Sequence, residues 1–517
     1  MTTEILFGQS YYLQFDPKLW AAQQPYPPLG TLYAAAVMRR EGHEVALFDA
    51  MLAESEEEWA AALDHHRPRF AVVYEDNFNY LTKMCLLRMR QAAFTMAQMA
   101  RARGCTVIAA GSDASDQSQA YLRAGFDFVL LGEGEQTLVE LIDRLTGRTT
   151  TPFDAIPGLA FCEDNRPRQN PRRAVINEVD ALPYPAWDLV DVERYRRIWL
   201  ERHGYYSMNM VTTRGCPYHC NWCAKPIWGQ RYHSRRPESV ADEMGWLKRT
   251  YRPDHIWFAD DIMGLTPHWW TSFADAVQAR DAVLPFKCLS RADLIVRSQT
   301  DVQALARAGC DIVWLGAESG SQRILDAMEK GTRVEQIYAA TRALRDAGIR
   351  IGFFLQFGYP GETRDDIART FQMVRDCRPD DIGMSVSYPL PGTKFHNTVR
   401  LQLSDKRNWV DSADLDMLYE GPFSTAFYRQ LHNVLHHEFR LRRAGAELRR
   451  VGPHPSLWRA AHLRQAGAAL YRAVTLPAER AKLDRLAAEP SRAIRPARHM
   501  SPEEAALPSP QVESPLP

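Results

Sequence analysis

The stretch RGCPYHCNWC, residues 214–223, places three cysteines within eight residues in a C-x3-C-x2-C pattern. The three cysteines are Cys216, Cys220 and Cys223. Three thiolates on one loop can hold one metal centre, and such soft ligands suit an iron–sulfur cluster or zinc. A structural zinc site needs a fourth ligand, and His219 is the only local candidate. A four-iron cluster held by three cysteines instead leaves one iron open to a substrate.

The cysteine loop follows the first of six apolar runs that alternate with helical patterns between residues 206 and 405. The predicted strands are Met208 to Thr212, His255 to Phe258, Phe286 to Leu289, Ile312 to Leu315, Ile351 to Gln356 and Gly383 to Ser387. Six strand–helix units favour a partial (β/α)6 barrel over a second open sheet, although periodicity alone does not separate the two. In a barrel the site lies at the carboxyl ends of the strands, where the cysteines stand.

Residues 1–150 also alternate short apolar runs with amphipathic stretches, which predicts a doubly wound, Rossmann-like α/β domain. The predicted strands are Glu4 to Phe7, Val45 to Phe48, Phe70 to Val73, Thr106 to Ala109 and Phe128 to Leu131. Ligands of such domains sit where loops leave the carboxyl ends of the strands. The overall fold class is therefore α/β.

The remaining segments differ in composition from these two domains. Residues 151–205 are rich in proline and charge and form a connector, with a hairpin expected around Asp164 and Asn165. Residues 406–487 are predicted to be a helical C-terminal domain. Residues 488–517 are predicted to be a disordered tail, because seven of the 28 residues from Pro490 onward are proline.

The composition excludes several classes of protein. Lys and Arg together number 63, as do Asp and Glu, so the balanced charge gives no case for nucleic acid. Nine cysteines are too sparse and too odd in number for a secreted disulfide framework. The chain shows neither a signal-peptide pattern at its N-terminus nor a run of about eighteen apolar residues. A cytoplasmic protein is therefore expected.

The cysteine pattern and its place after the first barrel strand closely resemble the radical S-adenosylmethionine (radical SAM) superfamily. The resemblance implies a four-iron four-sulfur cluster whose open iron is chelated by the amino and carboxylate groups of SAM. One electron from the reduced cluster then cleaves the C5′–S bond, giving methionine and a 5′-deoxyadenosyl radical. That radical abstracts hydrogen from carbons without an acidic proton, while the protein orients the reactants and excludes water.

The resemblance extends to the predicted strand ends and implies contacts with SAM. Asp260 and Asp261, after the second strand, look like the acidic turn that receives the methionine amino group. Arg291, after the third, looks like the group that meets the SAM carboxylate, and Glu318, after the fourth, resembles the acid that binds the ribose. Gly361 belongs to a loop that looks like the one near the adenine. Taken singly, such fragments are more often helix caps and turns, and only their joint placement favours a site.

An open α/β domain before a radical SAM barrel resembles the cobalamin-dependent subclass. The resemblance implies cobalamin contacts from Tyr74 and Asn77 in the loop 74–80, and from Gly132 and Gly134. The D-x-H-x-x-G pattern of a histidine lower ligand does not occur, so cobalamin is expected without that ligand. Two other interpretations stay open: the loop 74–80 as a capped helix start, and the two glycines as a weak dinucleotide motif.

The resemblance implies an enzyme that functionalises an unactivated carbon, most simply by cobalamin-dependent methyl transfer. A radical SAM cyclase or C–C bond-forming enzyme acting on a tetrapyrrole or a lipid is the alternative, and a non-enzymatic metal-binding module is an alternative of another class.

The expected partners are a small-molecule or lipid substrate and an electron donor such as flavodoxin or ferredoxin. The segment from Arg440 to Arg480 contains nine arginines and only two acidic residues. This excess of positive charge suggests either a peripheral membrane contact or a solvated helix face. The sequence identifies no catalytic side chain.

Overall fold

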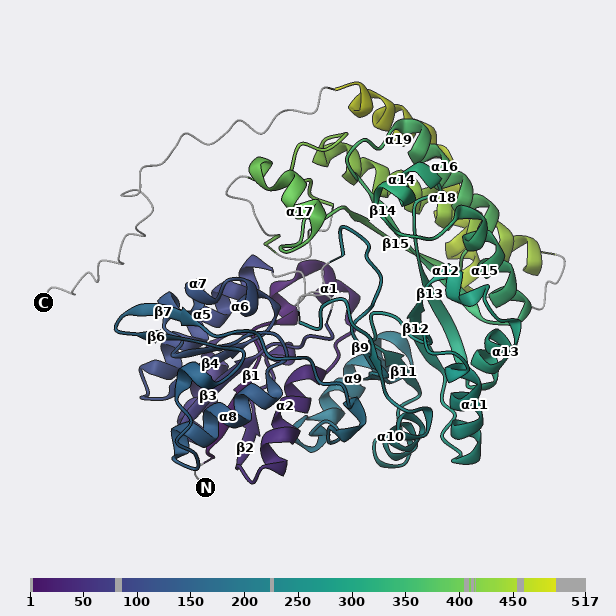
Figure 1. Cartoon of the computed structure of the whole chain (residues 1–517). Coiled ribbons are helices and arrows are strands. Elements are labelled where there is room, and N and C mark those ends of the chain that lie inside the picture. The colour runs from purple at the N-terminus through teal and green to yellow at the C-terminus, as the bar shows by residue number, and fades with distance from the viewer. Residues whose placement is uncertain are drawn as a thin grey trace, which may run out of the picture.

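The first domain is an open sheet that is parallel through its first five strands (Figure 1). The computed structural model describes residues 3–79, 86–223, 227–403, 409–410, 413, 415–452 and 460–489. In this part of the chain the sheet has seven strands in the order β2-β1-β3-β4-β5-β6-β7. The strands are β1 (Ile5–Gly8), β2 (Val45–Leu47), β3 (Phe70–Tyr74), β4 (Thr106–Ala110), β5 (Phe128–Leu130), β6 (Leu159–Glu163) and β7 (Arg166–Gln169). The order reverses between β1 and β3, and this switch point is where such sheets bind ligands.

Helices cover both faces of this sheet, because all five parallel strands are apolar on both sides. α2 (Leu29–Arg40) and α8 (Glu135–Thr146) pack on one face, and α3 (Glu57–His66), α5 (Leu87–Arg101) and α7 (Ser118–Ala124) pack on the other. The short helices α1 (Pro17–Ala22) and α6 (Ser112–Asp116) complete the domain. The doubly wound prediction is confirmed.

The hairpin expected in the connector is present and extends the first sheet. β6 pairs antiparallel with β5 and with β7, and Asp164 and Asn165 form its turn with positive φ angles of 49° and 60°. Asn and Asp tolerate this left-handed conformation better than most residues do. α9 (Val192–His203) then leads into the second domain.

The second domain is a curved parallel sheet that forms half of a barrel. Within the described residues it has six strands in the order β15-β14-β13-β12-β11-β8. The strands are β8 (Ser207–Met210), β11 (His255–Phe258), β12 (Phe286–Ser290), β13 (Cys310–Glu318), β14 (Arg350–Phe357) and β15 (Asp381–Val386). A small antiparallel pair, β9 (Thr213–Arg214) and β10 (His233–Ser234), flanks the cysteine loop. The partial barrel is confirmed.

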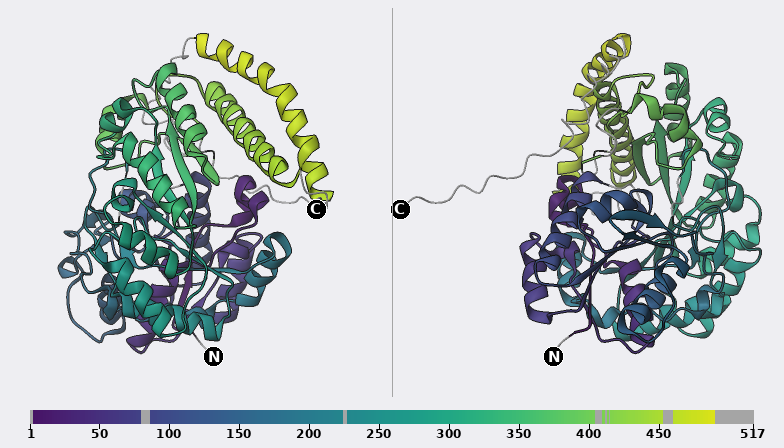
Figure 2. Two further views of the ribbon diagram at one scale, coloured as in Figure 1. Left: turned by 90° about the vertical axis from the view of Figure 1, so that its right-hand side faces the viewer. Right: turned by 60° about the vertical axis from the view of Figure 1, so that its left-hand side comes forward.

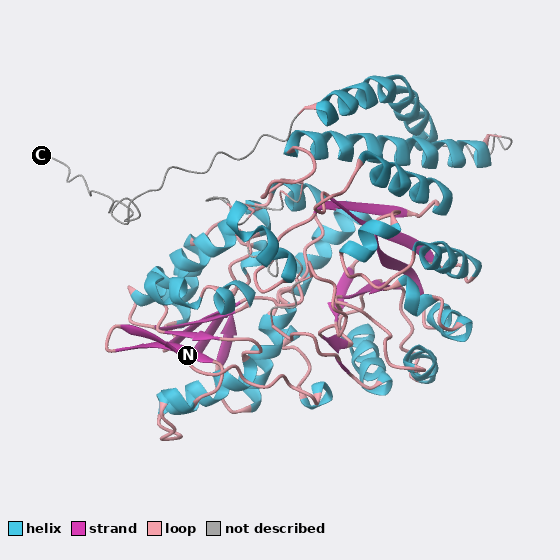
Figure 3. Cartoon of the chain, turned by 45° about the horizontal axis from the view of Figure 1, so that its top comes forward, coloured by secondary structure: helices cyan, strands magenta, loops and turns pink. Residues whose placement is uncertain are grey.

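Helices lie on the outer, convex side of the half-barrel, and Figure 3 shows them outside the magenta strands. They are α10 (Pro237–Thr250), α11 (Trp269–Ala279), α12 (Ala292–Ile295), α13 (Gln299–Arg307), α14 (Gln322–Ala327), α15 (Val334–Asp346) and α16 (Arg364–Cys377). α17 (Lys394–Val399) follows β15 and packs in a separate cluster with Ile324 of α14, Tyr359 and Tyr419. Each strand buries its outer side chains against the outer helices in one continuous core. The inner side chains therefore face the lumen.

Two long helices end the described chain, α18 (Thr425–Val451) and α19 (Ala460–Ala488). They run antiparallel, side by side, along the outside of the barrel (Figure 2). The predicted helical C-terminal region is confirmed for these residues, whereas the predicted disorder from 490 onward lies outside the described part. None of the helices within the described residues has the length and apolar character needed to cross a bilayer.

Candidate functional site

The cysteine loop leaves β9 at the carboxyl edge of the half-barrel. All three cysteines are half-buried, whereas His219, the residue that a zinc site would add, is exposed. Gly215 starts the loop with a φ of +81°, and a Cβ there would lie 2.3 Å from the carbonyl oxygen of Arg231. The described residues hold no preassembled group of three His, Cys, Asp or Glu side chains. The assignment of a cluster therefore depends on the ligand chemistry and spacing of the three thiols.

Asp260 lies beneath the cysteine loop and supports its start. Its carboxylate accepts hydrogen bonds from the backbone N–H groups of Thr212 and Thr213 at 2.7 and 2.8 Å, and from the Thr212 hydroxyl at 2.7 Å. Burial raises the pKa of Asp260 to about 6. Asp261 is exposed at the next position. Asp260 thus fixes the backbone that leads to the cysteines, and its contact with SAM stays a prediction.

Arg291 reaches the cysteine loop from the end of β12. Its Nη1 lies 3.9 Å from Cys220 Sγ, and its guanidinium carbon lies 3.6 Å from the Tyr218 ring centroid. Nε donates to Asp293 at 2.9 Å, and Nη2 donates to the Lys330 carbonyl at 2.8 Å. The side chain is therefore held rigidly, with one edge turned toward the predicted cluster.

Glu318 ends β13 in a strained conformation beside Arg291. Its φ of +56° is left-handed, which is uncommon for a residue with a Cβ, and the register of β13 with β14 shifts between Gly316 and Glu318. Its Oε1 accepts from Lys330 Nζ at 2.8 Å, and both side chains are less than 10% exposed. Burial lowers the pKa of Lys330, but the charges of Glu318 and Cys220 outweigh this effect and raise it. The sequence prediction missed Lys330, because no motif marks it.

Gly361 lies in the loop after β14 with a φ of +81°, a conformation that favours glycine. The next residue, Glu362, is 3% exposed and accepts from the Gly358 N–H at 2.7 Å. Its other oxygen, Oε1, is buried without a hydrogen-bond partner among the described residues, and burial raises the pKa of Glu362 to about 8. Arg291, Glu318 and this loop follow successive strands along one edge, as predicted.

We expect that Arg291→Ala and Glu318→Ala each weaken SAM binding by roughly 2–5 kcal/mol, because each removes a buried charge that would face a bound zwitterion. Calorimetric titration of SAM into anaerobically reconstituted enzyme measures the affinity. Arg280→Ala, which removes a half-buried arginine paired with Asp242 away from this edge, is the control and should leave the affinity unchanged. Unchanged SAM affinity in both test variants would show that SAM does not bind at this edge of the barrel.

The switch point of the first domain carries buried polar groups. Glu75, after β3, accepts from Ser10 at the end of β1, through the backbone N–H at 3.1 Å and the hydroxyl at 2.5 Å. Burial raises the pKa of Glu75 to about 7. Asn77 Oδ1 and Ser112 Oγ, after β3 and β4, are buried with no hydrogen-bond partner within the described residues. Such orphaned atoms at a ligand-binding edge fit a polar ligand such as a corrin with its side-chain amides.

The other predicted cobalamin residues lie at the same edge but differ in exposure. Tyr74 is 1% exposed and packs in the core, and its ring lies 2.9 Å from the position of a Cβ on Gly134. Gly132 has a φ of +80° and donates its N–H to Ser115 Oγ at 3.0 Å. Asp76 accepts hydrogen bonds from the Gly30 N–H at the start of α2 and from the Phe78 N–H in its own loop. Whether loop 74–80 is itself a capped helix start stays a prediction, because residues 80–85 lie outside the described part of the chain.

A buried ion triad joins the two domains two residues before Cys216. Arg214 Nη1 lies 2.9 Å from Glu133 Oε1, and Nη2 lies 2.7 Å from Glu135 Oε1. All three side chains are at most 5% exposed. The glutamates belong to the loop 132–135 of the first domain, so the loop assigned to cobalamin is linked to the loop assigned to the cluster. Sequence reasoning missed Arg214, because its partners lie about eighty residues away.

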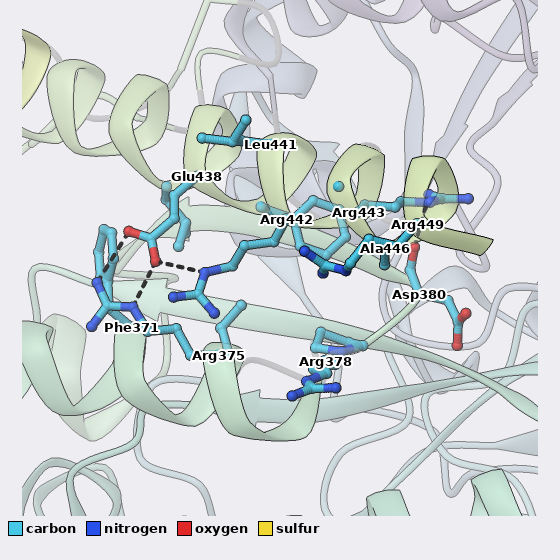
Figure 4. A pocket seen from close by; sticks show the side chains of 15 residues that line it. Phe371, Arg375, Arg378, Asp380, Glu438, Leu441, Arg442, Arg443, Ala446 and Arg449 are labelled. Carbon is cyan, nitrogen blue, oxygen red and sulfur yellow. Dashed lines mark hydrogen bonds and ion pairs between the residues drawn. The ribbon is translucent and has the colours of Figure 1, made fainter. Parts of the chain in front are cut away.

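A cavity of about 590 Å³ lies elsewhere, on the outside of the barrel between α16 and α18 (Figure 4). Its lining includes five arginines: Arg375, Arg378, Arg442, Arg443 and Arg449. Arg375 of α16 lies 2.6 Å from Glu438 of α18 and ties the two helices together, and Arg442, on the same helix as Glu438, pairs with it at 3.2 Å. This cavity shares no residue with the predicted SAM or cobalamin contacts.

The chain places three cysteines at the carboxyl edge of a parallel half-barrel, and an open α/β domain precedes the barrel in the sequence. This combination is typical of iron–sulfur enzymes that have a second cofactor-binding domain. The sequence profile of the radical SAM superfamily matches residues 210–374, and that of the B12 binding domain matches residues 20–142. The chain therefore contains a radical SAM domain and, in front of it, a B12 binding domain.

Individual proteins resemble the chain over most of its length. It is 26% identical to an uncharacterized methyltransferase, PH0819, of Pyrococcus horikoshii over 75% of this chain and 82% of that protein. It is 25% identical to the anaerobic magnesium-protoporphyrin IX monomethyl ester cyclase of Synechocystis, over 63% of this chain and 64% of the cyclase. The structure of the radical SAM methyltransferase TsrM from Kitasatospora setae, with cobalamin and a [4Fe-4S] cluster bound, shares the fold with a TM-score of 0.63. Identity there is 20%, over 79% of this chain and 76% of TsrM.

Proposed function

We propose that this chain is a cobalamin-dependent radical SAM methyltransferase that methylates an unactivated carbon of a small molecule. The observation that carries the proposal is the Arg214 triad, which links the loop 132–135 of the B12 binding domain to the cysteine loop. Two sites inferred independently from the sequence therefore meet across one domain interface. A methyl carrier and a radical source must lie close together to act on one substrate.

In this proposal each cofactor has its own set of residues. Cys216, Cys220 and Cys223 hold the [4Fe-4S] cluster, and Arg291, Glu318 and the loop with Gly361 hold SAM. Asn77, Ser112, Gly132 and Gly134 line the edge for cobalamin. When bound, cobalamin supplies a methyl carrier, and the cluster with SAM supplies a hydrogen-abstracting radical. Arg291, anchored by Asp293 and Lys330, orients the SAM carboxylate, and the buried triad excludes water from the interface.

The named relatives favour methyl transfer over the alternative reactions. The methyltransferase of Pyrococcus horikoshii is matched over 82% of its length, and the cyclase of Synechocystis over 64%. A purely structural metal module would not need a rigid arginine beside the cluster loop or a strained glutamate at a strand end.

We expect that protein expressed with hydroxocobalamin retains stoichiometric cobalt after desalting. Its cobalt(II) paramagnetic resonance spectrum should lack nitrogen superhyperfine splitting, because the D-x-H-x-x-G pattern is absent. The adjacent histidines His65 and His66 end α3 just before β3, away from the carboxyl ends of the strands. Asn77→Ala should lower the retained cobalt, and Asn397→Ala, at an exposed site on α17, should not. Retention with clear nitrogen splitting would refute the histidine-free site. Absence of retained cobalt would refute cobalamin-dependent methyl transfer.

The proposal also includes two expectations from the sequence. The protein is cytoplasmic, and a flavodoxin or a ferredoxin is its electron donor. The proposed cluster supports the cytoplasmic location, because its cysteine ligands must stay thiolates and a reducing compartment keeps them so. A peripheral contact with anionic membranes is supported by α19, where Leu463, Leu470, Tyr471 and Val474 are 65–71% exposed among arginines. Flotation with anionic vesicles tests this contact, and failure to float would remove it.

A further inference from the structure

The lumen of the half-barrel exposes a large apolar ring on a central strand. On β14, Phe353 and Leu355 point outward and are buried against the helices, so Phe354 between them faces the lumen. Phe354 is 41% exposed, although β14 has a neighbouring strand on each side. An apolar ring left open inside a domain is the mark of a binding surface more often than of a core.

Trp314 on β13 lies beside Phe354 and extends the apolar surface. The two ring centroids are 4.6 Å apart and the planes are inclined by 29°, so the rings are stacked. Trp314 is half-buried, whereas its neighbours Val313 and Leu315 are fully buried on the outer side. Two stacked rings with an open face can accept a further flat group by the same stacking.

Two glycines on the inner face make room for these rings. A Cβ on Gly352 would lie 2.4 Å from the Trp314 indole, and a Cβ on Gly383 would lie 3.4 Å from Phe354. Glycine inside a strand weakens the strand and often marks a place where a ligand or another group approaches closely. The inner face of β13 to β15 is therefore a flat aromatic floor.

Lys287 of β12 places a cation one level below this floor, at the level of Ile312 and of Arg350, which is ion-paired with Asp311. Leu289 of β12 pairs with Trp314, so Lys287, two residues earlier, faces the lumen one level lower. Its Nζ lies 4.8 Å from the Trp257 ring centroid and 5.3 Å from that of Tyr26, a residue of the first domain. No carboxylate of the described residues lies within ion-pair distance of this Nζ, and burial lowers the pKa of Lys287 to about 8. The cation is thus desolvated and mostly charged at neutral pH, and it makes no close ion pair within the described residues, although the Asp381 carboxylate acts on its charge from farther away.

We propose that Trp314, Phe354 and Lys287 form the substrate site, and that the substrate combines a flat apolar ring system with an anionic group. The proposal rests on the proposed function and adds the chemical class of the substrate. The stacked rings would hold the flat part, and Lys287 would hold the anion. Glu318 lies four residues beyond Trp314 on β13, about 13 Å along a strand, so a substrate on this floor would extend toward the SAM edge.

The test uses two probes with the same ring system, one anionic and one neutral: 8-anilinonaphthalene-1-sulfonate and N-phenyl-1-naphthylamine. Equilibrium dialysis against the holoenzyme with cluster, cobalamin and SAM bound gives the dissociation constants, so the cofactor sites are filled. We expect that Phe354→Ala and Trp314→Ala weaken both probes by about fivefold to tenfold. Phe354→Leu, which keeps an apolar side chain, should recover part of the affinity. Lys287→Met should weaken the sulfonate alone.

Tyr471→Ala is the matched control, because it removes a more exposed aromatic ring from α19, outside the barrel. Unchanged affinity in both Phe354→Ala and Trp314→Ala, or an equal loss in Tyr471→Ala, would overturn the site. An equal effect of Lys287→Met on both probes would overturn its anionic part. Each of these outcomes would overturn the substrate site or its anionic part and leave the proposed function standing. The proposed function fails by a different result, namely that the wild-type protein retains no cobalt.

Discussion

Replacement of Cys216, Cys220 or Cys223 by alanine is expected to abolish both iron–sulfur content and SAM cleavage, the largest effect predicted for any single substitution in this chain. Each variant leaves two thiolates on the loop, and a cubane with two protein ligands is under-ligated. Iron and sulfide analysis after anaerobic reconstitution measures the first property, and formation of 5′-deoxyadenosine measures the second.

Cys162→Ala provides the matched control, since Cys162 is an exposed thiol on β6 of the first domain. It should keep wild-type iron content and activity. Near wild-type iron and SAM cleavage in any one of the three loop variants would remove that cysteine from the ligand set. A zinc site would be indicated if the wild-type protein bound zinc and lacked iron and sulfide.

Arg214→Met is expected to lower the free energy of unfolding by about 3–5 kcal/mol, because it leaves Glu133 and Glu135 buried without their shared cation. The shift of the urea midpoint measures the loss. The triple variant Arg214→Met, Glu133→Gln, Glu135→Gln should recover most of the stability, since neutral amides remove the uncompensated charge. Arg39→Ala, which breaks an exposed ion pair with Asp188, should change stability by less than about 1 kcal/mol.

The same variant should show an altered pH dependence. Burial raises the pKa of Glu133 even with Arg214 present, and removal of that cation raises it further. A folded-state pKa above the unfolded value means that folding takes up a proton, so the stability of Arg214→Met should increase as pH falls below neutral. The deficit relative to wild type should shrink accordingly. A deficit of less than 1 kcal/mol at neutral pH would show that the triad does not hold the domains together.

Much of the site could be predicted, because its markers are local in sequence. Barrel strands were recognisable as apolar runs, and the polar residues that follow them lie at one edge by the geometry of parallel strands. The roles of individual side chains were less predictable. The sequence predicts that Asp260 contacts SAM, which stays a prediction, and does not predict that its buried carboxylate accepts from the N–H groups of Thr212 and Thr213. It singles out Glu318 but not the ion-pair partner of Glu318, Lys330.

The sequence by itself determined the spacing of the three cysteines, the order of the two α/β domains and the positions of the strand ends, since each depends on residues that are close together in the chain. Only the tertiary structure decided which distant groups meet. Arg214 finds Glu133 and Glu135 because domain docking leaves a buried guanidinium that must be paired. Phe354 faces the lumen and Phe353 the core, although both are equally apolar. Parallel strands are apolar on both faces, so their pattern does not say which side a helix will cover.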